Sequence, residues 1–246
     1  MAIVGPRWEI YSSEEEGGRR VVTFDLDLAN EKTHTPSTCH RVLMRCPVAM
    51  VMPTGMLKPE AAVPMRLAEE MLISSLEKAA VRCRLVARTT YAGHREFAFS
   101  VEDEGAFTPV VEAWQKKQKW ETRVVTHEGW EYFEDAIIPT ETGWEQIRNR
   151  ARVSDLVQAG TDPAAVHVLQ HAFAGTPEGL AKIAAELMDG GFTGRPDASR
   201  LVLSQDAALD VDEISTTTQM LAIVASEHGA SYEGWTAAII PLPVCR

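Results

Sequence analysis

Two carboxylates near residue 25 are the first side chains whose types and spacing could support chemistry. Asp25 and Asp27 stand two residues apart in an alternating stretch, which would place both on one face of a strand. Such a pair suits a divalent cation or a general acid and base. The same alternation assigns both side chains to the solvent face, so we expect an exposed acidic pair without a catalytic role.

Histidine and cysteine side chains follow within the next twenty residues. His34, Cys39 and His40 offer nitrogen and sulfur ligands, with Cys46 within reach. None of the cysteines has the Cys-x-x-Cys spacing of a zinc ribbon or a redox pair; they are Cys39, Cys46, Cys83 and Cys245. We therefore expect reduced, mostly buried thiols and no bound metal.

Two further groups of side chains could contact a ligand or a nucleic acid. His167 and His171 would share one strand face, at a separation that favours a partly buried structural pair over a chelate. Four arginines lie in a predicted hairpin and could contact RNA or an acidic segment; they are Arg82, Arg84, Arg88 and Arg95. The net charge of −11 disfavours RNA, so we expect a solvated strand face.

An acidic stretch precedes the last predicted helix. Asp212 and Glu213 would lie in its first turn, where carboxylates complement the positive end of the helix dipole. Asp206 and Asp210 lie before this turn, so the helix dipole does not account for them. We interpret Asp206, Asp210, Asp212 and Glu213 together as a candidate surface for binding a basic protein segment.

Motifs with a known mechanism are missing from the chain. It contains no Gly-rich phosphate loop, Rossmann glycine fingerprint, His-Glu-x-x-His or Gly-x-Ser-x-Gly. We therefore predict no catalytic residues, no cofactor and a function other than catalysis. An enzyme that assembles its site from scattered residues remains an alternative.

Composition indicates an acidic, folded protein of two domains. The chain has 246 residues, with 45% hydrophobic and 24% charged side chains, which is ordinary for globular proteins. Residues after 150 include five basic and twelve acidic side chains, so the second part is the more acidic. The N-terminus lacks a basic start followed by a long apolar run, and no segment approaches the length of a membrane span. We expect a cytoplasmic location, no membrane contact and no direct contact with nucleic acid.

Hydrophobic periodicity predicts two successive α+β domains. In the first, the expected order is strand, strand, helix, strand, strand, helix, strand, with the strands near residues 22–28, 42–48, 83–87, 97–101 and 122–126 and the helices near 65–79 and 107–114. The apolar stripe of the first helix leaves the other side to polar residues, so we expect these to face water: Glu69, Glu70, Glu77 and Lys78. Residues 127–150 mix aromatic side chains with a proline break and are interpreted as a connector between residues 1–126 and residues 151–246.

The second domain has a simpler predicted order. A short helix at 153–157 precedes strand, helix, strand, strand, helix and strand, at 166–168, 177–187, 192–195, 201–203, 212–224 and 235–239. This order is typical of a ferredoxin-like fold, with two helices on one face of an antiparallel sheet. The first domain shows nearly the same order, so we predict two ferredoxin-like domains.

The second domain also resembles a known family, regulator of ribonuclease activity B, or RraB. The residues that support this resemblance are Leu156 to Pro163, His171-Ala172-Phe173, Gly190-Gly191-Phe192 and Ser231-Tyr232-Glu233-Gly234-Trp235. The resemblance implies a protein that binds ribonuclease E and restrains RNA decay, without catalytic residues of its own. Glu233 and Ala172 stand where the family pattern has Asp and Trp.

The first domain resembles a domain of unknown function, number 695, that is often joined to that family. The residues are Trp8 to Tyr11, Arg88 to Phe97 and Trp130 to Phe133. This resemblance implies no activity. We therefore expect a protein-binding regulator, with the basic segment of an RNA-processing enzyme as its partner.

Two alternatives use the first domain. One is a small metal-dependent hydrolase with Asp25, Asp27, His34 and His40. The other is a ligand-sensing protein, by analogy with paired ferredoxin-like domains.

Overall fold

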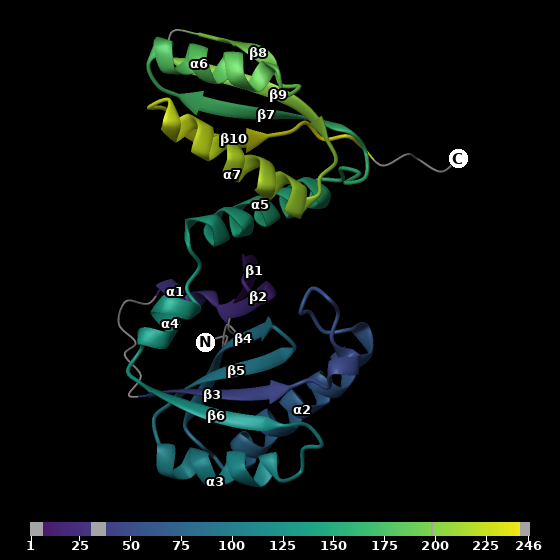
Figure 1. Cartoon of the computed structure of the whole chain (residues 1–246), viewed down its shortest axis with the longest axis vertical. Coiled ribbons are helices and arrows are strands. Elements are labelled where there is room, and N and C mark those ends of the chain that lie inside the picture. The colour runs from purple at the N-terminus through teal and green to yellow at the C-terminus, as the bar shows by residue number, and fades with distance from the viewer. Residues whose placement is uncertain (1–6, 31–37, 198, 242–246) are drawn as a thin grey trace, which may run out of the picture. The chain divides into compact units, whose positions relative to one another are not determined.

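The computed structural model describes residues 7–30, 38–197 and 199–241. The chain divides into two compact units, residues 1–143 and residues 144–246 (Figure 1). Each unit combines one antiparallel sheet with helices packed against it, which confirms the predicted α+β class. Among the described residues, no helix has the length and apolar character needed to cross a membrane.

The N-terminal unit is built on a sheet of six strands in the order β1-β2-β4-β5-β3-β6. All neighbouring strands are antiparallel. The strands are β1 (Trp8–Glu15), β2 (Gly18–Asp25), β3 (Thr38–Arg45), β4 (Cys83–Tyr91), β5 (His94–Val101) and β6 (Thr122–Glu128).

Two helices cover one side of this sheet, α2 (Pro59–Lys78) and α3 (Glu104–Gln115) (Figure 1). Pro59 occupies the first turn of α2, where its missing N–H leaves no hydrogen bond unmade. Asp103 caps α3, because its side chain accepts a hydrogen bond from the backbone N–H of Ala106 at 3.0 Å. The apolar stripes of both helices meet the sheet in one core, which includes Met65, Leu72, Phe97, Phe99, Phe107 and Trp114.

The other side of the six-stranded sheet holds the short helix α4 (Glu131–Ala136). Phe133 and Ile137 are fully buried, as is Phe24 of β2. The hydroxyl of Tyr11 on β1 donates to the carbonyl of Ile137 at 3.0 Å. The part of the predicted connector up to Ile137 therefore packs against the N-terminal sheet.

The C-terminal unit has four strands in the order β10-β7-β9-β8, again with all neighbours antiparallel. The elements are α5 (Glu141–Gln158), β7 (His167–Ala174), α6 (Pro177–Met188), β8 (Thr193–Pro196), β9 (Arg200–Ala207), α7 (Val211–Glu227) and β10 (Ser231–Thr236). Thr176 caps α6 through a hydrogen bond from Gly179 N, as its position before Pro177 predicts.

The helices of this unit share one face of the sheet. Leu169 and Phe173 point into the core from β7, and they pack with residues of α5, α6 and α7. The alternate side chains face the other way, and Val168 and Val202 are 52% and 38% exposed. One face of this sheet is consequently open within the unit.

Several predicted elements differ from the structure. The strand predicted to continue to Leu28 ends at Asp25, and a five-residue helix α1 (Leu26–Asn30) begins there. Strand β1 was not predicted. The short helix predicted at 153–157 is the end of the longer helix α5, and the last strand stops at Thr236.

Candidate partner-binding site

Four predicted acidic residues gather where β9 ends and α7 begins. Asp206 lies near the end of β9, on the open face of the sheet opposite Val168. Asp210 precedes α7, and Asp212 and Glu213 form its first turn. All four are exposed. We call this group the acidic edge.

Asp210 has a structural role within the acidic edge. Its carboxylate accepts hydrogen bonds from the backbone N–H groups of Asp212 and Glu213, both at 2.9 Å. These two donors have no partner inside the helix, so the side chain stabilises the start of α7. Capping therefore accounts for the carboxylate of Asp210, whereas it leaves that of Asp206 available for another role.

A fifth acidic residue, Asp162, lies in a loop whose backbone pairs with the segment before α7, and it was not predicted. The backbone N–H of Leu209 donates to the carbonyl of Pro163 at 3.0 Å, which places the loop before β7 beside the start of α7. Asp162 precedes that proline, and its side chain accepts from Ala164 N at 3.0 Å. The loop that holds Asp162 comes beside the start of α7 only through this tertiary pairing, because the two segments are far apart in the sequence.

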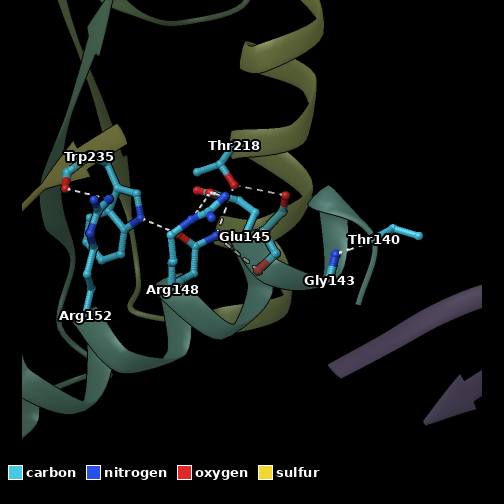
Figure 2. Close-up of polar contacts among 9 residues, drawn as sticks. Thr140, Gly143, Glu145, Arg148, Arg152, Thr218 and Trp235 are labelled. Atoms are coloured by element: carbon cyan, nitrogen blue, oxygen red, sulfur yellow. Dashed lines mark hydrogen bonds and ion pairs between the residues drawn. The ribbon is translucent and has the colours of Figure 1, made fainter. Parts of the chain in front are cut away.

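A buried asparagine fastens α7 to α5 and β10 (Figure 2). Asn149 of α5 is fully buried, and its amide nitrogen donates to Ser215 Oγ at 3.2 Å and to Thr218 Oγ1 at 3.0 Å. Its amide oxygen accepts from the indole N–H of Trp235 at 2.8 Å. Because these buried groups satisfy one another, they fix the position of the helix that presents the acidic edge.

Trp235 and its neighbour Gly234 depend on a second contact from α5. The guanidinium of Arg152 donates to the carbonyl of Trp235 at 3.3 Å (Figure 2). Gly234 has φ +112°, and a Cβ atom there would lie 2.7 Å from Arg152. The backbone conformation therefore favours glycine at 234, and a larger side chain there would also displace the flexible Arg152 guanidinium.

The two predicted histidines lie on one face of β7, as expected for a structural pair, but they are fully rather than partly buried. His167 contacts the carbonyl of Ala165 at 2.8 Å. His171 Nδ1 lies 2.9 Å from the hydroxyl of Tyr232, and burial lowers the pKa of His171 to about 4. Both imidazoles belong to the core of the unit.

The predicted carboxylate pair near residue 25 does not form on one strand face. Asp25 is fully buried, and its carboxylate pairs with Arg84 and accepts from the N–H of Asp27. Asp27 lies in α1, and its own carboxylate accepts from Arg7 Nε at 2.7 Å. The expected solvent exposure of Asp25 was wrong because β2 ends at that residue and the chain turns into a helix.

The predicted nitrogen and sulfur ligands do not converge. His40 is buried, with Nδ1 at 3.2 Å from Thr126 Oγ1, and burial lowers its pKa. Cys39 and Cys46 are free and buried, and Cys83 is free and half-buried. His34 and Cys245 lie outside the described residues. Within the described part of the chain, no three side chains of His, Cys, Asp or Glu are grouped as metal ligands.

The arginines of the hairpin were expected on a solvated face, and for two of them this was wrong. Arg82 is exposed and pairs with Glu102 at 3.1 Å. Arg88 and Arg95 are only 22% and 24% exposed, and both pair with Glu69 of α2. Glu69 is itself 8% exposed rather than facing water. Its spacing from Met65 and Leu72 places it on the apolar stripe, a signal that was present in the sequence.

A polar cluster that sequence reasoning missed holds α4 against the sheet. Tyr132 of α4 donates to Glu96 of β5, which also pairs with Arg41 of β3 at 2.6 Å. The Arg41 guanidinium stacks 4.1 Å from the centre of the Tyr132 ring, and His127 stacks on the same tyrosine. Glu96 is buried and the other three side chains are half-buried, so the cluster attaches α4, in the first part of the predicted connector, to the N-terminal sheet.

Fold and site together define an α+β protein of two sheet-and-helix units, of which the second presents an acidic edge. The chain belongs to the family of unknown function DUF695, whose family model matches residues 6–137, more than half of the chain. Residues 146–236 match the family model of regulator of ribonuclease activity B, RraB. Both resemblances noted in the sequence are thereby confirmed.

Other comparisons add little. No curated protein matches the chain. The crystal structure of an unknown protein from Galdieria sulphuraria matches 84% of this chain and 100% of its own, with 10% identity and a TM-score of 0.23. At that TM-score the likeness supports no conclusion about fold or function.

The large side chains among the residues that carry the RraB resemblance belong to the core, whereas most of the other residues are exposed or half-buried. His171, Phe173, Phe192 and Trp235 are buried, and Tyr232 is held by its contact with His171. These residues determine how the unit folds. The residues that would determine its partner must be sought on the surface.

Proposed function

We propose that this protein regulates a ribonuclease by binding to it, with a ribonuclease E-like enzyme as the partner and no catalysis of its own. The observation that carries the proposal is the match of residues 146–236 to regulator of ribonuclease activity B. The matched range covers β7 to β10, so the whole sheet of the C-terminal unit is included.

The acidic edge is the proposed contact surface. Asp206 and Glu213 are exposed, and the half-buried Asp162 lies in the loop that pairs with Leu209 just before α7. A cluster of one sign attracts a segment of the opposite sign and speeds its association. A basic segment of the ribonuclease is therefore the proposed counterpart, and the net charge of −11 disfavours direct binding to RNA.

Three finer statements belong to the same proposal. We infer that both units are ferredoxin-like domains, supported by the strand order β10-β7-β9-β8 and, in the N-terminal unit, by β4-β5-β3-β6 with α2 and α3 on one face. We propose that residues 1–126 and 151–246 form the two domains and that the joining residues 127–150 pack partly on each, with Tyr132 bound to the first and Asn149 to the second. We also propose a cytoplasmic location, where such a ribonuclease works on RNA.

The test measures cleavage of a fluorescent oligoribonucleotide by the purified ribonuclease E-like enzyme of the same cell. We expect the full-length protein to slow cleavage, and the double variant Asp206→Lys, Glu213→Lys to lose most of this effect. Two charge reversals in a surface contact commonly weaken binding by roughly tenfold or more. Asp210 is left intact so that α7 keeps its cap.

A matched control reverses two carboxylates away from the acidic edge. Asp189 and Glu227 lie at the ends of α6 and α7, where a lysine is compatible with the helix dipole. Asp189→Lys, Glu227→Lys changes the net charge equally and should retain inhibition. If the unaltered protein neither binds the enzyme nor slows it, the proposal fails. If both double variants lost inhibition equally, inhibition would depend on the overall charge of the protein and not on the acidic edge.

A further inference from the structure

A cavity of about 720 Å³ opens in the N-terminal unit beside α2. Its walls are α2 and the segment from Met52 to Pro59, and its floor is the part of β4 and β5 that carries Arg88, Thr90 and Arg95. This volume lies within the range of pockets that hold small molecules. The cavity is separate from the acidic edge, which belongs to the other unit.

The polar floor contains two arginines that share one carboxylate. Arg88 Nε donates to Glu69 Oε1, and Arg95 Nη2 lies 3.8 Å from Glu69 Oε2. Arg95 Nη1 donates to Thr90 Oγ1 at 2.7 Å. The Arg88 guanidinium also stacks 4.3 Å from the centre of the Trp8 ring, which fixes its orientation. Both arginines are therefore held in place before a ligand arrives.

The charges of this group do not cancel. Two guanidinium groups and one carboxylate leave an excess of one positive charge at the floor. Of the other charged residues in the lining, Arg66 pairs with Glu70 at 2.9 Å, and Lys58 is exposed to water with its ammonium donating to the carbonyl of Ala49 at 2.8 Å. Burial lowers the pKa of Arg95, which reflects the cost of its poorly solvated charge. A single negative charge placed beside Arg88 and Arg95 would offset that cost.

The rest of the lining is apolar. Met52, Met56 and Met65 contribute flexible thioether side chains, and Ile73 and Ala62 complete this side. Methionine adapts to ligands of different shape, because its side chain is unbranched and polarizable. The cavity thus joins a fixed cationic floor to an adaptable apolar wall.

We propose that this cavity binds a small organic monocarboxylate, with its carboxylate on Arg88 and Arg95 and its apolar body against the methionines. One negative charge matches the single excess positive charge of the floor formed by Arg88, Arg95 and Glu69. A phosphate dianion would leave one of its charges unmatched there. The proposal goes beyond the binding of a ribonuclease and gives the N-terminal unit a ligand of its own.

Calorimetric titration of the full-length protein with octanoate tests the proposal. We expect saturable binding of one octanoate per chain. Acetate lacks the apolar body, octylammonium lacks the negative charge, and octyl phosphate carries a second one, so each should bind at least about tenfold more weakly.

Three variants locate the site. Arg95→Met removes the charge but keeps the length of the side chain, and should weaken octanoate binding by roughly tenfold or more. Glu69→Gln removes the competing carboxylate and should strengthen binding. Arg82→Met makes the same charge change at an exposed position outside the cavity and should leave binding unaltered.

The outcomes separate cleanly when circular dichroism and melting temperature show that each variant is folded. Absence of saturable octanoate binding overturns the proposal. So does octylammonium binding as tightly as octanoate, or unaltered affinity in Arg95→Met. If Arg95→Met does not fold, a failure of Glu69→Gln to tighten binding decides against the site. None of these results depends on the ribonuclease.

Discussion

His171 shows how a single side chain can link the stability of the C-terminal unit to pH. The imidazole is fully buried, it contacts the Tyr232 hydroxyl, and its pKa is lowered to about 4. An unfolded chain would have the ordinary histidine pKa of about 6.5. Between these values the unfolded state binds more protons than the folded state. Stability is therefore complete above about pH 6.5 and is lost as pH falls toward 4.

We predict that His171→Gln reduces this pH dependence. From pH 7 to pH 5 the unaltered protein should lose about 2 kcal/mol from this group. Glutamine cannot titrate but can still pair with Tyr232, so the variant should lose less. Urea unfolding at both pH values, followed by fluorescence, measures the difference. Equal losses in the two proteins would contradict the assignment.

Other single residues show how far sequence reasoning reached. His167 and His171 were expected to be a structural pair and are buried. Asp25 was expected in solvent, but the helix that follows β2 turns its carboxylate inward to Arg84. Glu69 was assigned to the water side, although its position between Met65 and Leu72 already placed it on the buried stripe.

At the scale of elements, α7 is the helix whose start determines the acidic edge. The backbone N–H groups of Asp212 and Glu213, in its first turn, both donate to the side chain of Asp210. The predicted start of α7 agrees with the structure because the sequence pattern that marks it is local. Capping residues and the apolar period of 3.6 act within a few residues of one another.

We predict that Asp210→Ala destabilises the C-terminal unit by about 1 kcal/mol, the ordinary cost of losing an N-cap side chain. Asp210→Asn should retain most of that stability, because the amide oxygen also accepts hydrogen bonds. Asp206→Ala removes an exposed carboxylate outside the cap and should change stability little. Urea midpoints of the three variants test the assignment. A stable Asp210→Ala protein would show that the cap contributes nothing.

Elements at unit boundaries were harder to predict. Residues 127–150 were interpreted as a connector because they mix aromatic side chains with a proline break. In the structure Phe133 and Tyr132 are fixed by the N-terminal sheet, whereas Asn149 is buried in the C-terminal unit. These residues obtain their structure from distant partners, which no local pattern reveals.

At the scale of the whole molecule, the boundary between the two compact units falls within the residues of α5. The second unit begins at Trp144, ahead of the predicted domain start at residue 151. A fragment that starts at 151 would lack Asn149 and leave its buried partners, the indole of Trp235 and the hydroxyls of Ser215 and Thr218, without this hydrogen bond.

We predict that a fragment of residues 138–246 is more stable than one of residues 151–246 by roughly 2 kcal/mol or more, since each unsatisfied buried group costs about 1 kcal/mol or more. Urea unfolding of both fragments measures this. Asn149→Ala in the longer fragment should account for much of the difference, whereas Gln158→Ala, an exposed change in the same helix, should not. Equal midpoints for the two fragments would place the limit of the folded unit at residue 151.

The sequence by itself determined the α+β class, the hairpin at 83–101, the helices α6 and α7, the position of the acidic edge and both family resemblances. Each depends on residues that are neighbours in the chain or repeat at a helical or strand period. Only the tertiary structure decided that Asp25 is buried, that the loop of Asp162 pairs with the segment before α7, that Asn149 binds α7 and that Glu69 meets Arg88 and Arg95 in a cavity. These contacts join segments far apart in the sequence, and their stability comes from burial, which exists only once the chain has folded.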